Sequence, residues 1–525
     1  MTFYYVHPLT GNDKANGREN YPWKTIQASV GRLKTGDTLY LASTDDTNPA
    51  TAAVKHYVGG GILSKHFATV EDRTLIATED GRQALIVGND GDGNMLALDS
   101  KDHWAFKNVT MNARGMDRTS IMRFRDSTSN IYLENVRLEE VYGAGFQFTG
   151  QHKNIESLNC FVSQSAFSTT HNKAMESWSL PTGTGTIDGC LLQNFEVKSY
   201  GHMGGHVRGK NWVVRRALIQ HGGGKAWGVG TTSGKEGEKY GATNILFDDC
   251  IMHRIGDMEE DVDDTKIAHG AFSIANKATG GYIEIRNCQM SYLDGAGINV
   301  DADVSANVKI YNNLIYGWQR DYAKANNYVT GAIRVHEKDW ARGQSPSIEA
   351  RNNVFVGMDF TPYVHPKAAS RFWQVPANCA DNIVSSHNSY SGDTGHVPAV
   401  KLGRESYDTL AEFVKTEPGS FLVTDQMLTT PPIDEVDKYG DLTPLPDSPL
   451  IGAGTPLHFH DMDAVNIGPV QEGEVSPPDK PDPPDNDYQK QIDDIKRSLR
   501  DAGASLTVAG DALRLAGEIL RDDNG

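Results

Sequence analysis

Residues 131–138 read IYLENVRL, in which apolar and polar residues alternate on either side of an asparagine. The same pattern, apolar-x-apolar-x-Asn/Asp-x-x-apolar, recurs along the chain. Copies begin at Trp104, Ile131, Ile155, Trp212, Ile245, Ile283, Val308 and Ile348, with a weaker copy around Ile187. Each copy is too short for a helix and alternates with a period of two residues, so each predicts a β-strand.

The spacing of these copies predicts a solenoid. Successive copies start 24 to 40 residues apart where none is missed, and Gly, Asn and Asp punctuate the intervals as turn residues do. Strands recurring at this period, without helical patterns between them, indicate coils of a parallel β-helix rather than βαβ units. Coils of such a stack lie about 4.8 Å apart, so equivalent residues should form columns.

Two columns follow from this alignment. Asparagine or aspartate occupies one repeat position at Asn108, Asn135, Asn159, Asp249, Asn287, Asn312 and Asn352. Asparagine can adopt left-handed backbone at a turn and hydrogen-bond to its neighbours in the stack. Cysteine occupies the next position at Cys160, Cys250 and Cys288, and we expect Cys190 there in the weaker copy. Buried free thiols are expected rather than disulfides or a zinc site.

Composition limits the partners. The 525-residue chain has 50 Lys and Arg against 68 Asp and Glu, a net charge of -18. This acidity argues against nucleic acid as a partner, although a local basic strip could bind an acidic glycan. No window of about 18 apolar residues predicts membrane insertion. The first residues lack a recognisable signal peptide, so the sequence leaves open whether a leader has been removed.

Both ends of the repeat region resemble a known family. Residues 4–43 read YYVHPLTGNDKANGRENYPWKTIQASVGRLKTGDTLYLAS, and residues 445–457 read LPDSPLIGAGTPL. These stretches resemble the opening and the closing coil of pectate-lyase-superfamily β-helix proteins, a group that includes phage tailspike and depolymerase-like proteins. The resemblance covers residues 1 to about 471 and implies an all-β, right-handed parallel β-helix that binds or acts on polysaccharide.

The chain is therefore divided into four parts. Residues 1–40 are expected to form an N-terminal cap with the first strands, including a short helix within 25–33, and residues 41–475 the β-helix with its closing coil. Residues 476–487, SPPDKPDPPDND, predict an extended linker. Residues 488–525 carry apolar residues at helical spacing, in helices too short to be stable alone. We expect this tail to bind another copy, giving a homo-oligomer, or other virion proteins.

A second set of strands supplies the candidate site. Segments beginning at Gly145, Gly205, Gly270, Ala296 and Gly331 align by alternation. Their outward positions are then Gln147, His206, Arg208, Ser273, Asn299, Asp301, Arg334 and His336. This alignment makes Asn299 the neighbour of Arg334 and Asp301 the neighbour of His336. Carboxylate, imidazole and guanidinium on one rigid sheet could process or bind a glycan, although solvated sheet surfaces are also ordinarily polar.

This arrangement predicts catalytic and substrate-binding roles for individual residues. The candidate catalytic residues are Asp301, His336, Arg334 and Asp294; the candidate substrate-binding residues are Asn299, Arg208, Ser273, His206, Lys338 and Tyr292. Hydrolysis needs two carboxylates about 5–5.5 or 6.5–9.5 Å apart, for which Asp301 could pair with Asp294, Asp303 or Glu337. Elimination needs a cation for a uronate carboxylate and a base, roles open to Arg208, Arg334, His336 and Lys338.

Calcium is a further alternative. The acidic run at 256–264, GDMEEDVDD, could supply oxygen ligands or could simply be a solvated loop. The family's paired-aspartate calcium motif is not matched convincingly at residues 294–299. No metal ligand is therefore assigned.

Three functions remain open from the sequence. The first is a virion-associated spike or fibre that recognises a host-cell polysaccharide and, in its catalytic form, depolymerises it, acting on the virion or outside the cell. The second is a free polysaccharide lyase of the pectate-lyase type. The third is a structural or adhesive β-helix without catalysis.

Overall fold

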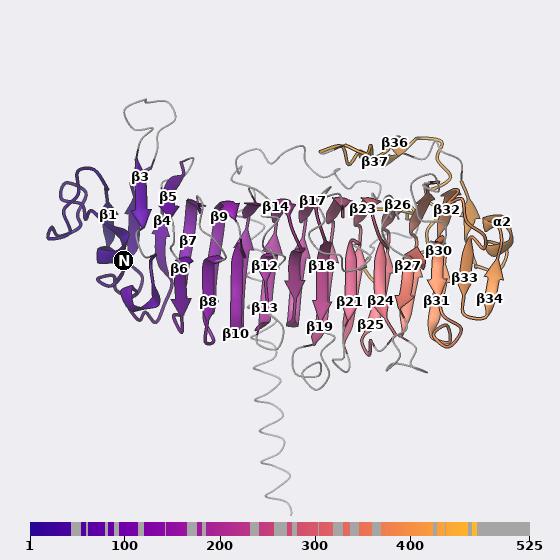
Figure 1. The fold of residues 1–525 in the computed structure, drawn as a ribbon, viewed down its shortest axis with the longest axis horizontal. Coiled ribbons are helices and arrows are strands. Elements are labelled where there is room, and N and C mark those ends of the chain that lie inside the picture. Colours follow the sequence, from indigo (N-terminus) through magenta and orange to yellow (C-terminus); the bar gives the residue numbers. More distant parts are fainter. Residues whose placement is uncertain are drawn as a thin grey trace, which may run out of the picture. The chain divides into compact units, whose positions relative to one another are not determined.

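The protein folds as a stack of coils (Figure 1). The computed structural model describes residues 1–43, 54–58, 61–78, 82–88, 94–113, 120–141, 143–164, 176–180, 185–230, 241–256, 270–275, 281–302, 304–318, 329–336, 346–359, 369–423, 428–435, 437–459 and 465–469. By its contacts the chain divides into two units, Met1–Ser476 and Pro477–Gly525. The second unit contains the predicted linker from Pro477 onward and the predicted helical tail, while Ser476 belongs to the first unit. The linker and the tail lie outside the described residues.

Each complete coil contributes strands to three walls, called faces I, II and III. Face I contains β1 (Phe3–Val6), β2 (Thr38–Leu41), β4 (Thr74–Ala77), the first part of β7 (Trp104–Asn112) and of β9 (Ser129–Val141), the second part of β10 (Phe146–Leu158), β13 (Gly185–Gln193), β16 (Gly209–Arg215), β19 (Ala242–Asp248), β22 (Tyr282–Arg286), β25 (Asn307–Tyr311), β28 (Ile348–Arg351) and β31 (Ile383–Ser386).

Face II follows after a sharp corner in each coil. It contains β3 (Lys55–Val58), β5 (Ala84–Gly88), the second parts of β7 and β9, β11 (Phe161–Gln164), β14 (Glu196–Tyr200), β17 (Leu218–Gly222), β20 (Ile251–Ile255), β23 (Gln289–Leu293), β26 (Leu314–Trp318), β29 (Val354–Gly357), β32 (Ser389–Gly392) and β35 (Phe421–Leu422).

Face III completes the coil. It contains β6 (Asn94–Asp99), β8 (Ser120–Arg125), the first part of β10, β12 (Glu176–Ser179), β15 (Met203–Val207), β18 (Lys225–Gly230), β21 (Phe272–Ala275), β24 (Ile298–Asp301), β27 (Val329–His336), β30 (Ala369–Val375) and β33 (Val400–Leu402). Within the described residues the coils pair in parallel, and β34 (Glu405–Tyr407) adds an antiparallel strand to their sheet, next to β33. The fold is the predicted right-handed parallel β-helix.

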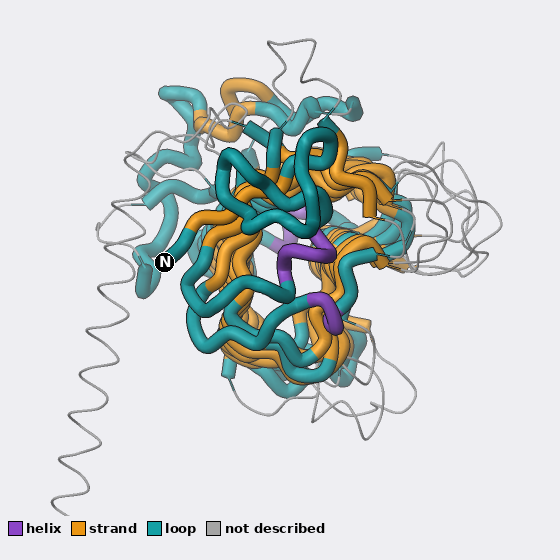
Figure 2. The backbone as a smooth tube through the Cα atoms, turned by 90° about the vertical axis from the view of Figure 1, so that its left-hand side faces the viewer, coloured by secondary structure: helices purple, strands orange, loops and turns teal. Residues whose placement is uncertain are grey.

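Inward side chains fill the interior between the walls. Seen along the solenoid, the strands superimpose into walls around this interior (Figure 2). The repeat residues form apolar columns, such as Trp212, Ile245, Ile283, Val308 and Ile348 on face I, each at most 1% exposed. Stacking buries these columns continuously, which is why single coils are not stable alone.

The predicted asparagine column lies at the corner between faces I and II. All of its members have positive φ, between 52° and 58°, a backbone conformation that asparagine tolerates better than most residues. Asn135 donates to the side-chain oxygen of Asn108 at 2.8 Å. In the weaker copy Asn194 continues the column, donating to Asn159 at 2.7 Å.

The cysteine prediction is correct for three positions and wrong for Cys190. Cys160, Cys250 and Cys288 follow the corner residue, and all five cysteines are buried free thiols. Cys190 instead lies on face I, in register with Ile155 and Trp212. The alignment of the weaker repeat is five residues out of phase, because its corner residue is Asn194 and the position after it is Phe195.

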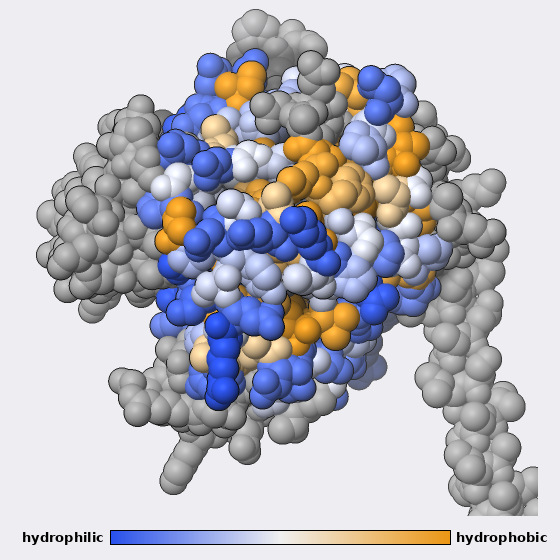
Figure 3. All heavy atoms as spheres, turned by 90° about the vertical axis from the view of Figure 1, so that its right-hand side faces the viewer, coloured by the Kyte–Doolittle hydropathy of each residue, from blue (hydrophilic) through white to orange (hydrophobic). Residues whose placement is uncertain are grey.

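Short helices close the ends. Helix α1 (Ile26–Val30) begins after Thr25, whose hydroxyl accepts from the backbone N–H of Ala28, as an N-cap residue does. The 3₁₀ helix η1 (Ser64–His66) lies near it, and α2 (Leu410–Phe413), with the capping residue Thr409, lies near the last coils. Figure 3 shows that last end, where hydrophilic residues surround apolar patches. In the described part of the chain, no helix could cross a membrane.

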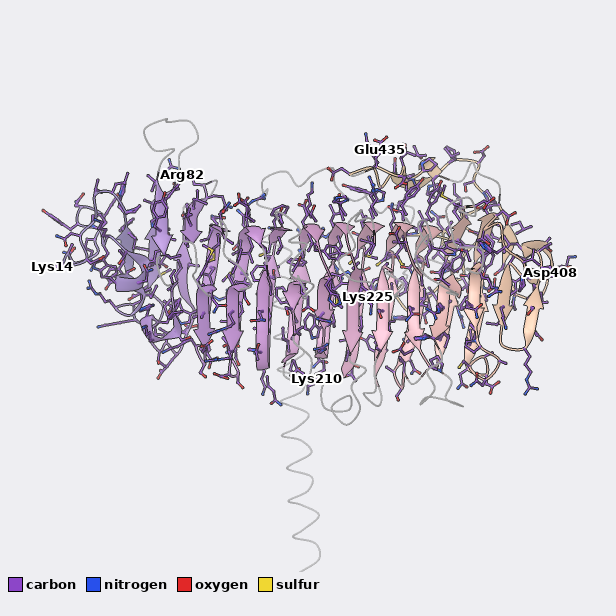
Figure 4. The ribbon with its side chains drawn as sticks, in the orientation of Figure 1. Lys14, Arg82, Lys210, Lys225, Asp408 and Glu435 are labelled. Atoms are coloured by element: carbon purple, nitrogen blue, oxygen red, sulfur yellow. The ribbon has the colours of Figure 1, made fainter. Side chains whose placement is uncertain are left out.

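The predicted closing coil does not continue the stack. Residues 428–435, 437–459 and 465–469, called the C-terminal return, instead lie along the outside of earlier coils. Its strands β36 (Leu428–Thr430) and β37 (Asp441–Pro444) pair only with each other, antiparallel. Glu435 of this return lies beside the upper ends of the strands in Figure 4, where its carbonyl contacts His253 of β20 at 2.6 Å.

Candidate functional site

The outward side of face III brings most of the predicted site residues together. One column contains, in coil order, His206, Gly228, Ser273, Asn299 and Arg334. Asp301 and His336 are opposite each other two residues further along their strands. Both predicted neighbour pairs, Asn299 with Arg334 and Asp301 with His336, are therefore correct.

The alternation that defined this surface also holds. The side chains between the outward residues point into the core, and each is at most 1% exposed: Val207, Phe272, Ile274, Ile298, Val300, Ile333 and Val335. The outward residues are less solvated than a plain sheet surface would be, since Arg208 and Asp301 are 3% exposed and His206 and Arg334 are 8% exposed. Charged groups are rarely buried without a partner or a function.

Asp301 and His336 make the first acid–histidine contact. The Asp301 Oδ1 atom lies 3.5 Å from the Nδ1 atom of His336. The Asp301 side chain is 5% exposed, whereas that of His336 is 36% exposed. Next to them, the side-chain oxygen of Asn299 is buried and makes no hydrogen bond in the described part of the chain. Such an unsatisfied acceptor suits a hydroxyl donor from a ligand.

A second acid–histidine cluster lies three and four coils earlier on the same face. Glu176, at the start of β12, accepts from the Ser179 hydroxyl at 2.5 Å through Oε2. The same oxygen lies 3.1 Å from the Nδ1 atom of His206, and Oε1 lies 3.5 Å from the Nδ1 atom of His202. Glu176 is the functional candidate that sequence reasoning missed. It lies outside the aligned segments, and the only signal for it was the pair of histidines at 202 and 206.

Burial sets the charge state of this cluster. Burial alone would raise the pKa of Glu176, but the charge of His206 and hydrogen bonds from both histidines and Ser179 bring that pKa well below its ordinary value. Burial, together with the charges of Arg208 and His202, lowers the pKa of His206, and Glu176 offsets only part of that shift. At neutral pH the pair is therefore a carboxylate and a neutral imidazole.

Arg208 lies beside this cluster. Its Nε donates to the backbone carbonyl of Gly230 at 3.0 Å, and its Nη1 donates to the carbonyl of Leu180. Burial lowers the pKa of Arg208 from its ordinary value, and the charge of Glu176 opposes that shift. Arginine stays protonated in proteins, so Arg208 brings a fixed positive charge to face III while joining neighbouring coils.

Small residues follow His206 in the next coils of the column. A Cβ atom added at Gly228 would meet the Sδ atom of Met203 at 2.6 Å and the Cδ2 atom of His206 at 2.9 Å, so both side chains lean over this glycine. The following coil contributes only Ser273 and Ala275 to the outward side. The next larger side chain in the column is that of Asn299, which lies three coils from His206, about 14 Å away along the stack.

The carboxylates on face III are not spaced for a glycosidase. Glu176 and Asp301 lie four coils apart, about 19 Å at the usual coil spacing. Asp294 lies at the corner before face III, next to Gly256. Strand β24 lies between Asp294 and Asp301 in the chain and spans about 10 Å by itself. The other proposed partners, Asp303 and Glu337, lie outside the described residues.

Three further candidates do not join the site. Tyr292 lies on face II, where its hydroxyl donates to the carbonyl of Pro432 at 3.2 Å; it is buried by the C-terminal return rather than directed to a ligand. Asp294 is separated from Asp301 as described above. Lys338 lies outside the described residues, as does nearly all of the acidic run considered for calcium. Among the residues that the structure describes, no group of His, Cys, Asp and Glu is arranged to hold a metal ion.

Comparison with known proteins concerns the fold. No protein-family model and no curated protein matches the chain. The A-module of mannuronan C-5 epimerase AlgE6 from Azotobacter vinelandii has a similar structure, with a TM-score of 0.52 and 14% identity over 76% of this chain and 94% of that one. Pectate lyase Pel9A gives a TM-score of 0.40 at 15% identity, covering 90% and 96% of the two chains. The chain is thus a right-handed parallel β-helix protein, with the fold of the mannuronan epimerase A-module.

Proposed function

We propose that the protein binds an acidic polysaccharide along face III and removes a proton from one of its uronate units. One observation carries this proposal: within five successive coils, the outward side of face III holds His206, Arg208, Arg334 and His336, with a buried carboxylate next to each histidine. Guanidinium groups pair with carboxylates such as those of uronates. A neutral imidazole is a suitable base for the adjacent proton.

Elimination fits this arrangement better than hydrolysis. In elimination a histidine takes the proton from the carbon that bears the carboxylate. The electron pair forms a carbon–carbon double bond, the glycosidic C–O bond breaks, and the leaving oxygen takes a proton. Hydrolysis would need two carboxylates within about 10 Å, whereas Glu176 and Asp301 lie about 19 Å apart along the stack. That a mannuronan C-5 epimerase shares the fold is compatible with this proposal.

Product analysis tests the reaction type. The purified full chain is incubated with polyuronides and with host polysaccharides, and ultraviolet absorbance and reducing ends are measured together. Absorbing, unsaturated ends support elimination, and new reducing ends without absorbance would refute it in favour of hydrolysis. Uptake of solvent deuterium without cleavage would show proton removal alone, while binding without either change would leave an adhesin.

The role of the cationic groups is tested by substitution. Arg334→Gln should weaken binding of a polyuronide at least tenfold, because a buried charge pairs strongly with a carboxylate. Lys210→Gln is the control, since Lys210 is an exposed cation on face I (Figure 4) that pairs with Asp188. Equal binding by both variants would contradict a ligand on face III.

We further propose that the protein is a virion-associated, extracellular spike or fibre that recognises host polysaccharide. The Pro/Asp-rich linker and the apolar spacing of residues 488–525 support an attachment segment. Deleting residues 488–525 should reduce the oligomer size or virion incorporation, measured by light scattering and by virion composition, while circular dichroism stays β-rich. Unchanged mass and incorporation would refute this role.

A further inference from the structure

Two acid–histidine pairs lie on face III, and they differ in quality. In the Asp301–His336 pair the nearest atoms are 3.5 Å apart and the histidine side chain is 36% exposed. In the Glu176–His206 pair they are 3.1 Å apart, and both side chains are at most 10% exposed. Only the Glu176–His206 contact is short enough for a hydrogen bond and also shielded from solvent.

The hydrogen bond fixes the tautomer of His206. An ionised carboxylate can only accept hydrogen bonds, so the proton of the neutral ring lies on Nδ1. Glu176 is itself held by Ser179 through Oε2 and by His202 through Oε1. The Nε2 atom of His206 is then left with its lone pair, which is the form that can accept a proton.

The imidazole edge next to Nε2 lies over Gly228, beside the side chain of Met203. The Cδ2 atom, bonded to Nε2, is the ring atom closest to the position of a Cβ on Gly228. In this direction the next side chain of the column is the small Ser273. The positive charge of Arg208 lies two residues along the chain.

We propose that Glu176 is a positioning residue that holds His206 in the Nδ1–H tautomer, so that Nε2 of His206 removes the proton from a uronate unit bound on face III. This inference rests on the proposed function and assigns the base to His206 rather than to His336. The proton moves from the sugar carbon to Nε2, and the resulting imidazolium is stabilised by Glu176 until the proton passes to solvent or product. The charged or titratable groups facing His206 are Glu176, His202 and Arg208.

A measurement on the protein without substrate tests the pair directly. Imidazole ¹⁵N spectra of the full chain, with the His206 signals identified by their loss in His206→Gln, should show Nδ1 protonated and Nε2 unprotonated at pH 7. In Glu176→Gln the amide can donate to Nδ1, so the proton should move to Nε2. Glu156→Gln, a face I glutamate on the neighbouring β10, is the control and should leave the His206 signals unchanged. A wild-type His206 protonated on Nε2 would overturn the proposal even if the variant fails to fold.

Kinetics then tests the consequence. Glu176→Gln should lower kcat on a polyuronide by about 10²–10⁴-fold with little change in KM, because moving the proton to Nε2 removes the contribution of His206 as general base. The acidic limb of its pH profile should move to lower pH, because the Glu176 charge raises the pKa of His206. Glu176→Asp should recover part of kcat. Absence of any substrate, with the expected spectra, would refute the proposed function but not the pair; an unchanged kcat on a cleaved substrate would refute the assigned role.

Discussion

At the scale of single residues, a buried ladder of amides accompanies the asparagines at the corner. Asn313, Asn353 and Asn388 follow the corner residues of three successive coils and are fully buried. The backbone N–H groups of Asn313 and Asn353 donate to the next amide oxygen at 3.0 and 2.9 Å. The Asn353 amide donates to the Ile310 carbonyl at 2.9 Å. Each amide thus satisfies backbone groups that the core would otherwise leave unpaired.

Breaking this ladder should be costly. Asn353→Leu leaves the backbone N–H of Asn313 and the carbonyl of Ile310, both on the preceding coil, without these hydrogen bonds, so we expect the free energy of unfolding to fall by about 3 kcal/mol or more, at about 1–3 kcal/mol per unsatisfied group. Urea denaturation followed by circular dichroism measures the change. Gln193→Ala, on the half-exposed outer side of face I, serves as the control and should cost less than about 1 kcal/mol. Similar losses in both variants would contradict the importance of the ladder.

The ladder ends at a buried carboxyl group with an unusual proton affinity. Glu417 accepts from Tyr390 at 3.0 Å and from Asn388 at 3.3 Å. Burial raises its pKa, although hydrogen bonds from Ser385 and other neighbours partly offset the effect. Because the folded pKa lies above the unfolded one, protonation of Glu417 favours folding. Its contribution is complete below the unfolded pKa of about 4.3 and is lost as pH rises through the folded pKa.

Glu417→Gln should therefore change the pH dependence of stability. The glutamine is uncharged at every pH, so the variant should gain stability relative to the wild type as pH rises from 4 to 8. Urea unfolding at intervals across this range provides the comparison, with Glu156→Gln as a surface control. Curves of wild type and Glu417→Gln that stay parallel throughout would show that Glu417 titrates normally.

At the scale of elements, the C-terminal return is the main departure from the predicted architecture. Its apolar residues Leu428, Leu442, Leu450 and Ile467 form a second core with Leu314, Val354 and Val356, on the outer side of face II. Lys198 of β14 forms an ion pair with Asp437 at 3.2 Å. The return therefore covers strands from β14 to β29.

The repeats predicted the coils and the neighbours on face III, because inward residues at a period of two must be apolar in every coil. Alignment failed for Cys190 because Gly189 before it has positive φ like a corner residue, although it matches Asn154 at the start of face I rather than Asn159. Glu176 was missed because a single polar residue outside the pattern has no periodic signal. The sequence does contain one sign of the return. Residues 354–357 read VFVG, with apolar residues at successive positions, as in strands that are covered on both sides. Which segment covers it depends on contacts distant in sequence.

Apolar packing should hold the return more strongly than its ion pairs. Leu450→Ala, at a fully buried position, should cost about 2–5 kcal/mol. Lys198→Ala removes a half-exposed ion pair and should cost less than about 1 kcal/mol. Unfolding free energies of the two variants make the test. A larger loss for Lys198→Ala would show that charges, not the second core, attach the return.

At the scale of the whole solenoid, stability is expected to be local, because each coil contacts only the coils on either side. The C-terminal return changes this within Met1–Ser476 by joining coils that are not neighbours. His253 on β20, Gln289 and Tyr292 on β23, and Asn352 after β28 all bond to it. The coils that carry β20 to β29 should therefore open together, whereas the coils before β14 have no such connection in the described residues.

Native-state hydrogen exchange can separate these two regimes. Amides in β20, β23, β26 and β29 should exchange with one common opening free energy, which Leu450→Ala lowers by the same amount for all four strands. Amides in β4, β7 and β9 should open with graded energies that this substitution leaves unchanged, since only neighbouring coils support them. If Leu450→Ala accelerated exchange equally along the whole solenoid, the stack would be a single cooperative unit. Face III would then owe its rigidity to the coils alone and not to the return.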